Sequence, residues 1–225
     1  MNSPVASRVL TILMPAWNEQ DGIRRAVAAA LEAAGDLVVG NEVSAVEVLI
    51  VDDGSTDDTA LILDELQRDD DRVRFVRHSD NRGLGAALRT GFGEANGSLI
   101  LYTDADLPFD LAEIGKALRL QRHYDADIVA AYRHDRTGEG LRRVAYSYLY
   151  NSLVRAVFGL TVRDVNFAAK LMRADLFDRI TLRSDGSFID VELLARADRD
   201  GSRIINSVST TSRGPVGCRP CRRVR

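Results

Sequence analysis

The chain has 225 residues, of which 45% are apolar, and a formal net charge of −3. This length and apolar content suit one α/β domain with a sizeable core. The last thirteen residues hold five arginines and no acid, so residues 1–212 carry 25 basic and 33 acidic side chains, a net charge of −8. Such an acidic body argues against a nucleic-acid partner. We expect a single domain over residues 1–212 and a basic, disordered tail over residues 213–225.

The sequence contains neither a stretch of about 18 consecutive apolar residues nor a recognisable signal peptide. We therefore expect the chain to stay in the cytoplasm without crossing a membrane. Cys218 and Cys221 form a Cys-x-x-Cys near the end of the chain, with no second ligand pair. We interpret these cysteines as incidental rather than as a redox or zinc site.

Short apolar runs alternate with apolar residues spaced three and four apart, which predicts strands alternating with helices. Pro15 and Gly35 mark the ends of the first strand and of the first helix. In chain order, the predicted elements are strand 9–14, helix 23–34, strand 46–51, a helix capped by Thr56 or Asp57, strand 73–77, helix 84–95, strand 99–103, strand 127–132, helix 141–160, strand 165–172, a helix from residue 187 to Gly201, and strand 203–208.

This alternation predicts a mostly parallel sheet with helices on both faces. Ligands of such sheets collect at the carboxyl ends of the strands. The polar residues that follow the predicted strands there are Asn18, Asp52, Asp53, Asp104 and Asp106. The chain has no Gly-x-Gly-x-x-Gly after its first strand and no Gly-x-x-x-x-Gly-Lys, so a dinucleotide-binding fold and a phosphate-loop kinase both lose support.

Asp104 and Asp106 directly follow a buried strand and are separated by one residue. An isolated Asp-x-Asp is usually a surface turn, but a second strand that ends in Asp52 and Asp53 brings more acid to the same edge. Paired carboxylates suit a hard cation that keeps coordination sites open for phosphate oxygens. A cation such as Arg133, after the strand over residues 127–132, can assist in binding phosphates.

Two later segments leave their roles open. The predicted helix over residues 141–160 has one continuous apolar stripe flanked by Arg142, Arg143 and Arg155, which suits either the core or a membrane surface. Asp190 and Glu192 lie in the first turn of the next predicted helix, where carboxylates either complement the helix dipole or act in function.

Nine short segments occur in an order and spacing typical of one enzyme family. They are residues 14–19 (MPAWNE), 51–57 (VDDGSTD), 81–87 (NRGLGAA), 102–106 (YTDAD), 131–133 (AYR), 150–154 (YNSLV), 158–164 (FGLTVRD), 170–173 (KLMR) and 188–193 (FIDVEL). On these segments the chain resembles the family 2 glycosyltransferases of the GT-A fold. Within that family it is most similar to the polyprenyl-phosphate (dolichyl-phosphate) mannose and glucose synthases.

The resemblance implies an inverting transferase that uses a GDP- or UDP-sugar. It implies a donor site at Pro15, Ala16, Asn18, Glu19, one or both of Asp52 and Asp53, Gly83 and Asp104. Asp104 and Asp106 would hold Mg²⁺ or Mn²⁺ on the diphosphate, and Arg133 would offset charge on the departing nucleoside diphosphate. A phosphate acceptor needs no general base, whereas a hydroxyl acceptor would need one, and Asp190 is then the candidate.

The resemblance also implies a polyprenyl phosphate acceptor, met by peripheral contact with the cytoplasmic face of a membrane. Three alternatives remain open at this point. One is a glycosyltransferase that acts on a soluble or polysaccharide hydroxyl, and another is an inactive homologue that binds a nucleotide sugar. The third is a sugar nucleotidyltransferase, which normally opens with a glycine-rich basic loop that the Pro15 region lacks.

Overall fold

The computed structural model describes residues 8–108, 110–133, 152, 154, 157–160 and 162–209. The strands are β1 (Val9–Ala16), β2 (Ala45–Asp52), β3 (Val73–Arg77), β4 (Leu99–Thr103), β5 (Ile128–Arg133), β6 (Ala169–Arg173) and β7 (Ile204–Ser209). The helices are α1 (Ile23–Val39), α2 (Thr59–Asp69), α3 (Leu84–Glu94), α4 (Ile114–Tyr124), α6 (Leu176–Arg179) and α7 (Ile189–Arg199). A short 3-10 turn, η2 (Leu111–Glu113), precedes α4.

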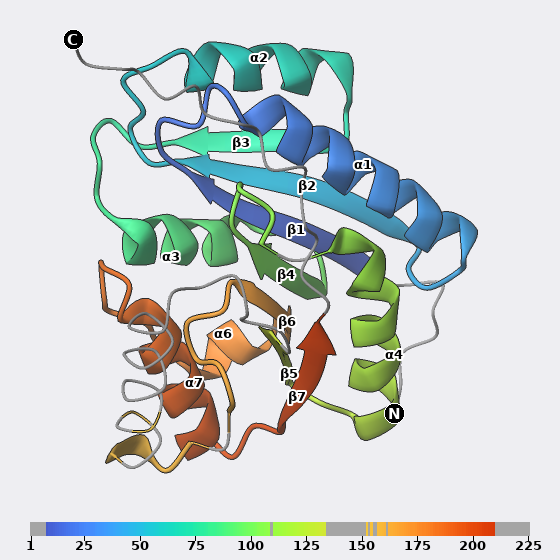
Figure 1. Cartoon of the computed structure of the whole chain (residues 1–225), viewed down its shortest axis with the longest axis vertical. Coiled ribbons are helices and arrows are strands. Elements are labelled where there is room, and N and C mark those ends of the chain that lie inside the picture. The colour runs from blue at the N-terminus through green and yellow to red at the C-terminus, as the bar shows by residue number, and fades with distance from the viewer. Residues whose placement is uncertain are drawn as a thin grey trace, which may run out of the picture.

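The strands form one sheet in the order β3-β2-β1-β4-β6-β5-β7 (Figure 1). β6 runs antiparallel to both of its neighbours, and the other pairs are parallel. This arrangement confirms the predicted mostly parallel sheet. The carboxyl ends of β1, β2, β4 and β5 share one edge of the sheet, which we call the carboxyl edge. The opposite edge, where these strands begin, is called the amino edge.

Helices cover both faces of the sheet, as the alternating pattern predicted. α1, α2 and α4 pack on one face, and α3, α6 and α7 pack on the other (Figure 1). Side chains of β1 alternate between the two layers, because successive residues of a strand point to opposite faces. Leu10, Ile12 and Met14 enter the first layer, and Leu13 enters the second.

Two predicted helix boundaries were wrong. The first helix continues through Gly35 to Val39 and ends at Gly40, whose N–H donates to the carbonyl of Asp36 at 2.8 Å. A glycine inside a helix costs about 1 kcal/mol, which burial of the following turn at Leu37 offsets. The second helix begins at Thr59 with Asp58 as its N-cap residue, although the Asp57 carboxylate accepts the Thr59 N–H at 3.0 Å.

The strand predicted over residues 165–172 is shorter than expected. β6 begins at Ala169, whose N–H donates to the carbonyl of Phe167 at 2.8 Å. This tight turn keeps the preceding residues out of the ladder. The apolar run alone did not reveal the turn, because buried loops and buried strands have similar composition.

Several predictions lie outside the described residues. They concern the helix over residues 141–160, apart from residues 152, 154 and 157–160, and the tail with Cys218 and Cys221. Among the helices that the structure describes, none has the length and apolar content needed to cross a bilayer.

Residues 183–185, which precede α7 in the sequence, contact both α7 and α3. Burial alone would raise the pKa of Glu192, but hydrogen bonds from the N–H groups of Ser184 and Arg183 lower it to about 2. On the other side, the N–H of Gly85 donates to the carbonyl of Asp185 at 2.7 Å. A Cβ at Gly85 would lie 2.1 Å from the Ser184 carbonyl oxygen. The close approach of these two backbones therefore requires glycine.

We expect Gly85→Ala to lower the free energy of unfolding by about 2 kcal/mol or more, because backbone atoms must move to admit the methyl group. Gly93→Ala in the same helix is the control, since a Cβ there meets nothing within 4 Å. That control should leave stability unchanged or raise it by up to about 1 kcal/mol. Urea unfolding measures both, and equal effects of the two changes would contradict this packing.

Candidate active site

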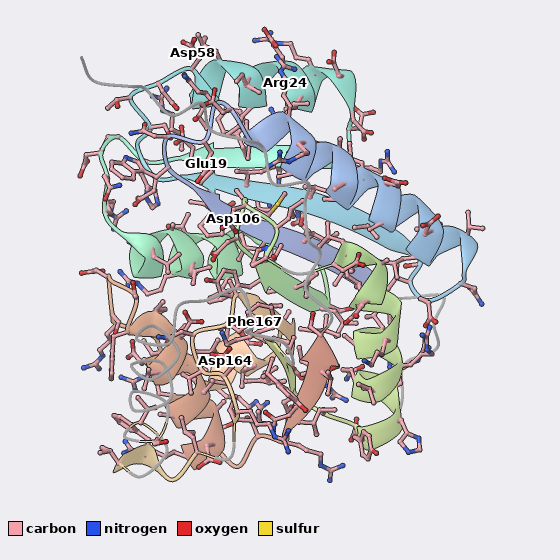
Figure 2. The ribbon with its side chains drawn as sticks, in the orientation of Figure 1. Glu19, Arg24, Asp58, Asp106, Asp164 and Phe167 are labelled. Carbon is pink, nitrogen blue, oxygen red and sulfur yellow. The ribbon has the colours of Figure 1, made fainter. Side chains whose placement is uncertain are left out.

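The predicted site residues gather at the carboxyl edge. β1 lies between β2 and β4, and Ala16 pairs with Asp52 at the end of β1 and β2. Asp104 follows β4 directly. Figure 2 shows Glu19 and Asp106 at this edge, above Phe167 in the view. The sheet therefore brings the acids of two strand ends to either side of β1.

Hydrogen bonds tie the loop after β1 to the loop after β2. Asn18 adopts a left-handed conformation (φ 55°), its N–H donates to Oγ of Ser55 at 2.9 Å, and its Oδ1 accepts the Thr56 N–H at 2.9 Å. The N–H of Glu19 donates to Oγ1 of Thr59 at 2.8 Å. Asn18, which was predicted to bind the donor, thus has a defined role in holding the two loops together.

Asp52 is fully buried at the end of β2. Its Oδ1 accepts the Ser55 N–H at 2.9 Å. Its Oδ2 lies 3.2 Å from Nε of Arg77 but accepts no hydrogen bond from the described residues. A buried oxygen that lacks a hydrogen bond can accept one from a ligand.

Asp53, by contrast, is satisfied within the chain. Its carboxylate lies 2.7 Å from Nδ1 of His78 and accepts the N–H groups of Arg82 and Gly83 at 3.0 and 2.8 Å. His78 is itself held at Nε2 by Thr90. Asp53 and Gly83, both predicted to contact the donor, therefore fix the loop that leads into α3.

Asp104 and Asp106 lie close enough to affect each other. Burial and the carboxylates of Asp106 and Asp190 raise the pKa of Asp104 to about 6. The Tyr102 hydroxyl, whose own pKa is raised by burial and by Asp190, donates to Oδ1 of Asp104 at 3.2 Å. Asp106 is exposed. The pair thus combines one oriented, partly buried carboxylate with one open to solvent.

Glu19 adds a third carboxylate to this region. Burial raises the pKa of Glu19, and the carboxylates of Asp106 and Asp57 raise it further. Within the described residues, however, no group of three or more His, Cys, Asp or Glu side chains is arranged to hold a metal ion. Two carboxylates alone leave most of the coordination of Mg²⁺ or Mn²⁺ to water and to a bound ligand.

Lys170 is a site residue that sequence reasoning missed. Its Nζ is fully buried, lies 2.6 Å from Oδ1 of Asp190 and donates to the carbonyl of Phe167 at 2.8 Å. It also lies 5.6 Å from the centre of the Tyr102 ring. A lysine inside an otherwise apolar strand was the signal in the sequence, because such a lysine is seldom buried without a partner.

The carboxyl end of β5 adds basic residues. Arg133 is the last residue of that strand. The guanidinium of Arg163 lies 5.0 Å from the centre of the Tyr132 ring, and Nη1 donates to the Tyr132 hydroxyl at 2.9 Å. Arg163 is exposed and so presents a fixed positive charge at this edge. The sequence signal was its position in the segment over residues 158–164.

The chain is similar in sequence to known glycosyltransferases. Glycosyltransferase AglD of Haloferax volcanii is 31% identical over 200 residues, which cover 87% of this chain and 32% of AglD. The polyprenol monophosphomannose synthase of Mycolicibacterium smegmatis is 27% identical over 223 residues, 92% of this chain and 78% of the relative. The chain thus spans about a third of AglD and most of the second relative.

The fold is shared with solved glycosyltransferases. The mannosyltransferase PcManGT from Pyrobaculum calidifontis, solved in complex with GDP-Man and Mn²⁺, superposes with a TM-score of 0.64 at 20% identity. The superposition covers 96% of this chain and 60% of PcManGT. Residues 11–181 match the family profile described as glycosyl transferase family 2. The chain belongs to glycosyl transferase family 2.

Proposed function

We propose that this protein transfers a sugar from a GDP- or UDP-sugar to a polyprenyl phosphate, with inversion at the anomeric carbon and with Mg²⁺ or Mn²⁺ on the diphosphate. The name of the M. smegmatis relative, a polyprenol monophosphomannose synthase, supports the acceptor. The GDP-Man and Mn²⁺ bound to PcManGT support the donor and the metal.

The observation that carries this proposal is the Asp104–Asp106 pair. Burial raises the pKa of Asp104, repulsion by the Asp106 carboxylate raises it further, and Nζ of the buried Lys170 is already paired with Asp190. A divalent cation supplies the missing charge, and carboxylate oxygens are the ligands that Mg²⁺ and Mn²⁺ prefer. When bound, the metal stabilises negative charge on the departing nucleoside diphosphate.

The donor nucleoside fits the loops after β1 and β2. The Oδ2 of Asp52 can accept an N–H of the base, because this buried oxygen accepts no hydrogen bond from the described part of the chain. Pro15 and Ala16 form the end of β1 beside it. The indole of Trp17 is 53% exposed, and we assign it to stacking on the base.

The contacts of Asp190 favour a phosphate acceptor over a hydroxyl. Asp190 is buried and its carboxylate is already bound to Nζ of Lys170 at 2.6 Å, so this carboxylate is committed to a contact within the chain. An acceptor that is already anionic needs no base. Arg163, and Arg133 at the end of β5, are assigned to attract this anion and the diphosphate.

We infer that the protein binds its lipid acceptor at the cytoplasmic face of a membrane. We assign the membrane contact to the segment over residues 141–160. Its apolar stripe and flanking arginines suit an interface with anionic head groups. This assignment rests on the sequence of that segment and on the acceptor proposed above.

Transfer is tested with radiolabelled GDP- and UDP-sugars, Mg²⁺ and polyprenyl phosphate, followed by partition of the label between water and organic solvent. We expect the label to enter the organic phase and to stay in water when excess chelator is present. Asp106→Asn should slow transfer by about a hundredfold, roughly 3 kcal/mol in barrier, while the exposed Asp36→Asn should not. A labelled product that remains water-soluble would support the hydroxyl acceptor, and no turnover would support an inactive homologue.

Asp104→Asn should stabilise the metal-free protein at neutral pH. The raised pKa means that the folded state holds the Asp104 proton more tightly than the unfolded state, so stability falls as the pH rises from about 4 to about 6 and stays lower above that range. We expect a gain of about 2 kcal/mol at pH 7.5 that disappears as the pH falls below about 4, where both states are protonated. Urea unfolding in EDTA at several pH values measures this gain. A gain that is independent of pH, or one shared by Asp36→Asn, would rule out the charge effect.

Trp17→Ala should weaken binding of GDP or UDP about tenfold, since stacking of a base on an aromatic ring is worth about 1–3 kcal/mol. Tyr124→Ala is the matched control, because Tyr124 is a similarly exposed aromatic residue at the end of α4, far from the carboxyl edge. Calorimetry with Mn²⁺ present measures both. Equal affinity of the Trp17 variant and the parent would remove Trp17 from the donor site.

A further inference from the structure

A cavity of about 780 Å³ opens at the amino edge of the sheet. Its walls come from the starts of β1 and β4, the end of β6, the second half of α3, the last turns of α4 and residues 174–182 around α6. No residue assigned above to the donor, metal or acceptor lines it. The volume lies in the range of small-molecule sites, about 300–1,000 Å³.

One end of the cavity carries a buried positive charge. Arg8 is only 7% exposed, and its Nη1 donates to Oε1 of Gln121 at 3.2 Å. Burial lowers the pKa of Arg8, and the guanidinium groups of Arg122 and Arg173 lower it further. Among the described residues no carboxylate forms an ion pair with Arg8, whereas Arg173 is paired with Asp125. A buried charge without a counter-charge is costly, which favours an anionic ligand.

The described part of the chain offers little to neutralise Arg8. Residues 1–7 and 210–225 contain no acidic side chain. Asp135 and Glu139 are the acidic residues outside the described part. Asp175 and Asp178 also line the cavity, but the one carboxylate that raises the pKa of Arg8 is Asp125.

Part of the wall is apolar, although Arg89, Arg173, Asp175 and Asp178 also line the cavity. The rings of Phe92 and Phe177 stack with their centres 4.1 Å apart and their planes 15° from parallel. Leu99, Ile180 and Leu182 line the cavity as well. Apolar surface next to a buried guanidinium matches a ligand that has an anionic group at one end and an apolar body at the other.

We propose that this cavity binds a small amphipathic anion, such as a phosphate monoester of a short apolar alcohol. The anionic oxygens accept hydrogen bonds from Arg8, and the apolar body lies against Phe92 and Phe177. The site lies at the opposite edge of the sheet from the donor site and does not depend on the proposed transfer reaction.

The test is calorimetric titration of the full chain with hexyl phosphate, and separately with inorganic phosphate, hexanol and hexyltrimethylammonium. We expect hexyl phosphate to bind at least tenfold more tightly than phosphate or hexanol, and the cation not to bind. Arg8→Gln should weaken binding at least tenfold, because it keeps a donor for Gln121 but removes the charge. Arg68→Gln, which removes an exposed charge from α2, should have no effect.

A second variant tests the apolar part of the site without touching Arg8. Gly93 lines the cavity, and a Cβ there meets nothing within 4 Å, so Gly93→Leu fills the space without a clash at its first atom. We expect it to reduce hexyl phosphate binding at least tenfold while cooperative thermal unfolding is retained. If Arg8→Gln does not fold, Gly93→Leu still tests whether hexyl phosphate binds in this cavity.

Two results would overturn the proposal: hexyl phosphate binding no tighter than hexyltrimethylammonium, or equal binding by the parent and by Gly93→Leu. Co-sedimentation with phosphatidic acid vesicles distinguishes a lipid head group from a free phosphate monoester as the ligand of this cavity. Loss of co-sedimentation in Arg8→Gln would identify a lipid head group as the anion. If hexyl phosphate binds but no Arg8-dependent co-sedimentation is observed, the anion is a free ligand.

Discussion

Repulsion among carboxylates at the carboxyl edge is the interaction on which the rest of the site depends. Glu19, Asp104, Asp106 and Asp190 come from separate segments, and the sheet and α7 hold them near one another. Burial raises the pKa values of Glu19 and Asp104, and this repulsion raises them further. Lys170 offsets part of this charge but is committed to Asp190. The fold therefore maintains an arrangement of carboxylates that is unfavourable by itself, as is common at functional sites.

The edge can tolerate this repulsion because its loops are fixed by other contacts. Asn18 joins the loops after β1 and β2, and Asp53 holds the loop before α3 through His78 and two backbone N–H groups. These bonds hold the loops in place without a contribution from a ligand. A site organised in this way loses less conformational entropy on binding.

The sequence predicted where the acids lie better than what each acid does. Apolar runs that end in Asp52 and Asp104 were sufficient to place both residues at one edge, since parallel strands end together. Whether Asp52 or Asp53 faces the donor depends on His78, which lies 25 residues away, and the pairing of Lys170 with Asp190 spans 20 residues. Contacts of this range are set by packing and leave no local pattern. The antiparallel direction of β6 was unpredictable for the same reason, because an apolar run does not specify its orientation.

The amino-edge cavity and the carboxyl edge are connected by a short segment. Residues 180–182 line the cavity, residues 183 and 184 donate their N–H groups to Glu192, and Glu192 lies two positions after Asp190 in α7. A ligand in the cavity can change the affinity of the proposed donor site only if it binds more tightly to one position of this segment than to another. The contact of Gly85 with Ser184 and Asp185 leaves little room for a second position, and the Glu192 carboxylate accepts the N–H groups of residues 183 and 184. The rigidity of this connection therefore favours independent binding at the two edges over allosteric coupling.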